Sequence, residues 1–113
     1  MSCVTDLDEL LKTMEPTLVD GSFVYASVPA EDLADHLGRG PIGLFREEEG
    51  VTLILPAEAA EGLAASPPIR MITLTVHSSL EAVGLTGAFA AALTAERISA
   101  NVVAGYHHDH IFV

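Results

Sequence analysis

The end of the chain, GYHHDHIFV, places three histidines and one aspartate in four consecutive positions, 107–110. Imidazole nitrogens bind zinc and nickel and also transfer protons, so this stretch is a candidate metal site, catalytic cluster or polar turn. Because side chains alternate between the two faces of a strand, His108 and His110 are expected on one face. Two histidines at this spacing are a candidate zinc or nickel pair, to which His77 could add a third ligand.

The rest of the sequence favours a polar turn that shapes a ligand pocket. Cys3 is the only cysteine, and neither a cysteine pair nor a carboxylate–histidine motif accompanies the histidines. We therefore expect no metal and no other cofactor, with Asp109 and His110 lining the pocket instead. The metal-binding alternative, a metal-dependent protein using His77, His108 and His110, remains open at this point.

A hydrolytic triad is disfavoured, although Ser78 and Ser79 precede the helical pattern over about residues 83–96. Adjacent residues on a strand point to opposite faces, so His77 and Ser78 do not pair easily. The chain also lacks a G-x-S-x-G elbow to present a serine nucleophile. The sequence therefore predicts a protein that is not an enzyme.

The loop over residues 78–84 is suited to receive a carboxylate. It leads into an apolar helical pattern over about residues 83–96, and the first N–H groups of a helix have no partners within it. Gly84 allows close approach of a ligand to the backbone. This loop is the candidate anion site of the chain.

The elements that position these residues follow from periodicity and turn signals. Helices are expected over 5–14, 29–38, 57–65 and 83–96, and strands over 21–28, 42–47, 51–55, 69–77, 99–105 and 110–113. This order is β-α-β-β-α-β followed by β-α-β-β, which indicates an α+β, ferredoxin-like protein built from two tandem units. We place the units at residues 1–66 and 67–113, separated near Ser66-Pro67-Pro68, with shared or exchanged strands, above all 69–77.

Composition narrows the choice of partners. The chain has 113 residues, half of them hydrophobic, and carries a net charge of −11. Such a charge repels nucleic acid and anionic membrane surfaces, so neither is an expected partner. The first residues lack a signal-peptide pattern, and no apolar run reaches the roughly 20 residues that span a bilayer. The sequence predicts a cytoplasmic protein.

The second half, ITLTVHSSLEAVGLTGAFAAALTAERISANVVAGYHHDHIFV, resembles the ACT-domain superfamily of amino-acid-sensing regulatory modules, and more narrowly a bacterial family of small tandem ACT-like proteins of uncharacterised function. FREEEGVTLIL in the first half is similar to the same narrower family. That family's pattern usually continues beyond Val113 into a Pro-led segment and a helix. The resemblance implies a small-molecule sensor, with an amino acid or related metabolite as ligand, that forms a homodimer.

The resemblance also implies where the ligand binds, between the loop before the helix and the following strand. The implied ligand-binding residues are Ser78, Ser79, Val83, Gly84, Leu85, Thr86, Asn101 and Asp109. In this arrangement the helix start holds the ligand's carboxylate end, while Asn101 holds its ammonium group or side chain. Asp109 is a second possible ammonium partner across the hairpin. A purely structural or partner-binding module without a ligand is the remaining alternative.

Overall fold

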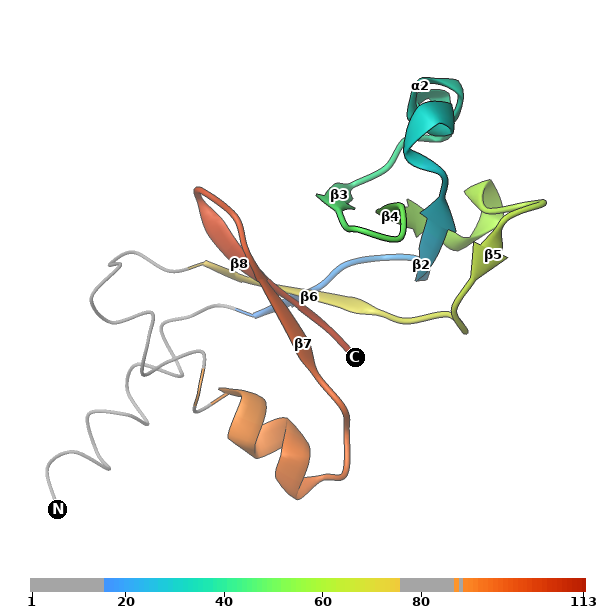
Figure 1. The fold of residues 1–113 in the computed structure, drawn as a ribbon. Helices are drawn as coiled ribbons and strands as arrows, with labels where there is room; N and C mark the ends of the chain where they lie inside the picture. The colour runs from blue at the N-terminus through green and yellow to red at the C-terminus, as the bar shows by residue number, and fades with distance from the viewer. Residues whose placement is uncertain (1–15, 76–86, 88) are drawn as a thin grey trace, which may run out of the picture. The chain divides into compact units, whose positions relative to one another are not determined.

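The computed structural model describes residues 16–75, 87 and 89–113, which form two antiparallel sheets of four strands each (Figure 1). Each sheet belongs to its own unit of the chain. Unit 2 comprises Asp20–Arg70, and unit 1 combines Met1–Val19 with Met71–Val113. The α+β, ferredoxin-like fold expected from the sequence is confirmed, with few helical residues beside the strands.

Unit 2 is built around strands β2 (Phe23–Val28) and β4 (Val51–Pro56), which pair antiparallel over their whole length. β3 (Gly43–Arg46) extends the sheet beyond β4, and the short β5 (Ala64–Ala65) extends it beyond β2. Alternate residues of β2 and β4 face the core, as period-two alternation predicts. These buried residues are Val24, Ala26, Val28, Val51, Leu53 and Leu55.

A helical segment over residues 30–39 covers the buried face of unit 2. It consists of the 3-10 turn η1 (Ala30–Asp32), helix α2 (Leu33–His36) and the 3-10 turn η2 (Leu37–Arg39). Leu33 packs against the core. The segment ends at Gly40, whose φ of 76° is favourable for glycine, which has no Cβ. The sequence-based helix after Pro29 is therefore confirmed.

The prediction of a helix over residues 57–65 is wrong. Only η3 (Ala57–Ala59) is helical, as a single 3-10 turn, and the chain then turns at Gly62 with φ of 81°. Ala64 and Ala65 pair with Ser27 and Ala26 of β2. The alanine-rich composition of this segment favours a helix. Few residues separate β4 from β5, however, and the pairing of β5 with β2 outweighs the helix propensity.

Unit 1 has β6 (Met71–Thr75) and β8 (His108–Phe112) at its centre, with β7 (Asn101–Ala104) and β1 (Thr17–Leu18) at the edges. Residues 87 and 89–95 are helical, in the part of the expected 83–96 helix that the structure describes. Phe89 and Leu93 pack against Leu74 and Ile111, as the helical spacing predicts. Ala92 follows Phe89 by three residues and was therefore expected on the same buried face of the helix, but it is exposed. The expected helix over 5–14 lies outside the described residues.

The two sheets repeat one strand order. Unit 2 has β3-β4-β2-β5, and unit 1 has β7-β8-β6-β1, so β1 occupies in unit 1 the place that β5 occupies in unit 2. β1 precedes unit 2 in the sequence yet pairs with β6, through Thr17 with Thr73 and Leu18 with Ile72. Strand exchange is thus part of the fold. For this reason the division into units differs from the continuous division at residues 66 and 67 expected from the sequence.

Among the described residues, none of the helical segments has the length and apolar character needed to cross a membrane.

Candidate functional site

The histidine-rich stretch forms the tip of the β7–β8 hairpin. Gly105 donates its N–H to the carbonyl of His108 at 2.9 Å, which leaves Tyr106 and His107 as a two-residue turn. A Cβ at position 105 would lie 2.8 Å from the His108 carbonyl oxygen and 3.3 Å from His110 Nε2. Glycine at this position therefore allows the hairpin to close tightly. Tyr106 is 98% exposed at the tip.

Along β8 the side chains alternate as the sequence predicts. His108 pairs with Thr75 of β6 and His110 pairs with Thr73, and paired residues of an antiparallel sheet share a face. The Thr73 hydroxyl and His110 Nδ1 lie 3.0 Å apart, within hydrogen-bond distance. His108 and His110 are therefore on one face of the sheet, and one nitrogen of His110 is already engaged by Thr73.

The environment of His110 favours its neutral form. Partial burial lowers the pKa of His110 below its ordinary value of 6.5, and the nearby His108 lowers it further. Asp109 acts in the opposite direction and raises the pKa. The net lowering means that the imidazole of His110 is predominantly uncharged at neutral pH.

A three-histidine metal site is not assembled by the part of the chain that the structure describes. No group of three or more histidine, cysteine, aspartate or glutamate side chains with metal-binding geometry occurs among these residues. His108 and His110 supply a pair, and His77 lies outside the described residues.

Asp109 lies on the opposite face of β8 from the two histidines. It pairs with Leu74 of β6 on one side and with Ala104 of β7 on the other. Leu74 is fully buried, and Phe89 and Leu93 of the helical segment pack over this face. Asp109 itself is partly buried. A carboxylate is thus placed beside the apolar core on the helix-covered face, next to the last residues of β6.

Asn101 is not brought to the same place as Asp109. Asn101 pairs with Phe112 at the other end of the hairpin, and its side chain shares the face of His108 and His110. The two candidate ammonium partners are therefore on opposite faces of one sheet. The remaining predicted ligand residues, Ser78, Ser79, Val83, Gly84, Leu85 and Thr86, lie outside the described residues.

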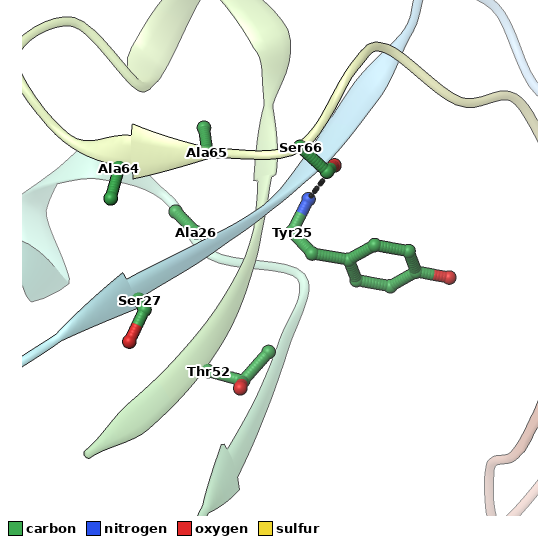
Figure 2. A pocket seen from close by; sticks show the side chains of 7 residues that line it. All are labelled: Tyr25, Ala26, Ser27, Thr52, Ala64, Ala65 and Ser66. Carbon is green, nitrogen blue, oxygen red and sulfur yellow. Dashed lines mark hydrogen bonds between the residues drawn. The ribbon is translucent and has the colours of Figure 1, made fainter. Parts of the chain in front are cut away.

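A hollow of about 340 Å³ lies in unit 2 (Figure 2). Its lining consists of Tyr25, Ala26, Ser27, Thr52, Ala64, Ala65 and Ser66. Ser27 and Thr52 are cross-strand partners whose side chains face away from the apolar core. The hydroxyl of Ser66 accepts the Tyr25 N–H at 3.0 Å, and that of Thr52 donates to Glu47.

Sequence reasoning missed this hollow. The alternation in FVYASV already indicates that Tyr25 and Ser27 point away from the core. The position of Ser66 depends on the pairing of β5, which replaced the expected helix. The hollow offers hydroxyl groups and small apolar side chains, and no charged side chain lines it.

Comparisons with known proteins identify the family. A family model described as ACT domain matches residues 2–68. A crystal structure of a Vibrio cholerae protein of unknown function, described as a possible transport protein, is 53% identical with a TM-score of 0.84, and the match covers 97% of this chain and 85% of that one. An Agrobacterium tumefaciens protein shares the fold at 17% identity with a TM-score of 0.72, over 87% of this chain and 75% of that one.

No curated protein matches the chain. The family-model match includes the whole of β1 to β5, that is, most of unit 2 together with the strand exchanged into unit 1. ACT domains are regulatory modules that bind small molecules. On the family match and on the repeated sheet order, the chain belongs to the ACT-domain family.

Proposed function

We propose that the protein is a regulatory sensor that binds an amino acid or a related metabolite through unit 1. The observation that carries the proposal is the position of Asp109, a partly buried carboxylate on the helix-covered face of the sheet beside Leu74. The same end of β6 leads into the loop that the sequence predicts to receive a carboxylate. The two ends of a zwitterionic amino acid would then have complementary partners.

Charge favours an ammonium group at Asp109. A carboxylate attracts an ammonium group, and this attraction is stronger at a partly buried position than in bulk water. His110, the adjacent residue, directs its side chain to the other face of the sheet. In the proposal, the ammonium group of the ligand lies on the Asp109 face. The ligand's carboxylate is assigned, as part of the proposal, to the helix start at Val83, Gly84, Leu85 and Thr86.

Thermal unfolding with each of the twenty standard amino acids tests the proposal. A ligand present at a hundred times its dissociation constant adds about 2.7 kcal/mol to the free energy of unfolding, which should raise the melting temperature by several degrees. Asp109→Asn should weaken binding by about tenfold to a hundredfold, because it removes a charged hydrogen-bond acceptor.

The matched control is Asp35→Asn, which removes an exposed carboxylate from α2 in unit 2. It should leave both the melting-temperature shift and the affinity unchanged. If no amino acid at millimolar concentration moves the unfolding midpoint of the wild type, the proposed function is wrong.

A further inference from the structure

The hollow of unit 2 results from one row of residues that crosses the sheet. Four successive cross-strand partners share the face that points away from the core: Phe45 of β3, Thr52 of β4, Ser27 of β2 and Ala64 of β5. Thr52, Ser27 and Ala64 have small side chains. Phe45 at one end of the row and Tyr25 beside it on β2 are bulkier, so the small side chains leave a depression of about 340 Å³.

Two hydroxyl groups of the hollow have already committed their protons. A hydroxyl has one proton to donate and two lone pairs that accept. Thr52 donates its proton to the carboxylate of Glu47. Ser66 donates its proton to the carbonyl of Pro67 at 3.0 Å and accepts the Tyr25 N–H at 3.0 Å. Both hydroxyls therefore offer lone pairs to the hollow, and a ligand that bonds to either must be a hydrogen-bond donor.

The charges beside the hollow favour a donor that is also a cation. The carboxylate of Glu47 is exposed and is held next to the hollow by its bond to Thr52. Donation to a carboxylate polarises the Thr52 hydroxyl and strengthens it as an acceptor. Arg46, the residue before Glu47, pairs with Val51 and therefore points to the opposite, core-facing side of the sheet. The net charge of −11 on the chain adds a general attraction for cations.

The rest of the lining suits a short apolar body. Alanines on β2 and β5 and the ring of Tyr25 complete it (Figure 2). The face of an aromatic ring also attracts a cation. A ligand carboxylate, in contrast, would be repelled by Glu47 and would meet no cationic side chain among the described residues that line the hollow. The volume lies near the lower end of small-molecule sites, which span about 300–1,000 Å³.

We propose that the hollow of unit 2 binds a small organic amine that has no carboxylate. Its ammonium group, with three protons to donate, bonds to the hydroxyls of Thr52 and Ser27 beside the charge of Glu47. Its apolar body crosses β2 towards Ala64. This site lies within unit 2 and does not depend on the amino-acid site proposed for unit 1, so either one can fail without the other.

NMR titration of the ¹⁵N-labelled full chain with three probes of equal length tests the proposal. Butylamine, 1-butanol and butanoate differ only in the head group, and at pH 7 the amine is protonated and the acid is ionised. Butylamine should give saturable shifts of the amide signals of Ser27, Thr52 and Ala64. The alcohol should bind more weakly, and butanoate should not bind. Absence of saturable shifts with butylamine, or equal binding of all three probes, would overturn the proposal.

Two matched pairs of variants separate charge from hydrogen bonding. Glu47→Gln should weaken butylamine binding by about twofold to fivefold, the usual range for an exposed ion pair. Glu49→Gln removes the same charge from the same exposed turn and should keep the wild-type affinity. An equal effect of both substitutions would mean that only the general charge of the chain attracts the amine, and would overturn the site.

Thr52→Val removes the hydroxyl acceptor and should weaken binding by about twofold to tenfold. Its control is Thr94→Val in unit 1, where the hydroxyl likewise donates to an acceptor, the Ala90 carbonyl at 2.9 Å. Ala64→Leu should fill the hollow from an exposed position and abolish binding. The amide spectra show directly whether each variant is folded, and Glu47→Gln carries the test if Ala64→Leu is not. Binding that persists unchanged in the folded Thr52 and Ala64 variants would overturn the proposal.

Discussion

His110 couples the ionisation of one side chain to the stability of unit 1. Its pKa is lowered by burial and by His108, so the folded state binds a proton less readily than the unfolded state. As pH falls from about 7 towards 5, the unfolded chain takes up this proton first, and the free energy of unfolding should decrease. His110→Gln should make the unfolding midpoint less dependent on pH across this range.

The control for this measurement is His107→Gln. His107 lies at the exposed hairpin tip, where its ring meets that of Tyr106 edge-on at 4.9 Å between centroids. Chemical denaturation of both variants from pH 5 to pH 8 should show a flattened dependence for His110→Gln alone. An equal slope in wild type and His110→Gln would contradict the coupling.

The β7–β8 hairpin is held by backbone hydrogen bonds and by its close turn at Gly105. We expect the purified, untagged protein to carry no stoichiometric zinc or nickel, and EDTA to leave its melting temperature unchanged. The reason is that His108 and His110 supply two ligands where a structural zinc site uses four. Elemental analysis that finds one metal per chain, lost in the His108→Gln, His110→Gln double variant, would refute this.

The sequence was sufficient to predict the elements that have strong alternation of apolar and polar residues or clear turn residues. Val24, Ala26 and Val28 mark the buried face of β2, and Gly50 marks the β3–β4 turn with φ of 153°. β1 escaped prediction because two residues are too few to show a period. The segment over residues 57–65 was wrongly predicted as a helix because its alanines favour a helix, whereas its last residues pair with β2 as a strand.

The candidate site could be predicted only in part, because the pairing between strands cannot be read from the sequence of one strand. Alternation along β8 was enough to place His108 and His110 together. The relation of Asn101 to Asp109 depends on the register between β7 and β8, which the turn sets. The two-residue turn pairs Ala104 with Asp109, which puts Asn101 on the other face. Four polar residues in succession at the tip left several turn lengths open.

The edge strands of the two sheets, as the described residues form them, predict self-association. β3 is the edge strand of the unit 2 sheet, and the side chain of its Phe45 is 72% exposed. β7 is the edge strand of the unit 1 sheet, and its Val103 is 44% exposed. Edge strands with apolar side chains are templates for pairing with another chain. Sedimentation at micromolar concentration should therefore show a homodimer.

Lysine substitutions identify the interface. Phe45→Lys or Val103→Lys should give a monomer when its strand forms the contact, because a charged side chain blocks edge pairing. Glu49→Gln, at the exposed β3–β4 turn, changes the net charge by the same amount and should leave the dimer intact. A monomeric wild type would contradict the prediction, and a dimer in both lysine variants would exclude edge pairing.

The exchange of β1 has a consequence for how the protein is made. A ribosome releases β1 first and its partner β6 only after all of unit 2 has been synthesised. Unit 2 has every strand of its sheet available while β6 to β8 are still unmade, so it can fold during translation. β1 must wait for its partner strand through that interval. Cutting the gene between the units would leave the later fragment without one edge of its sheet.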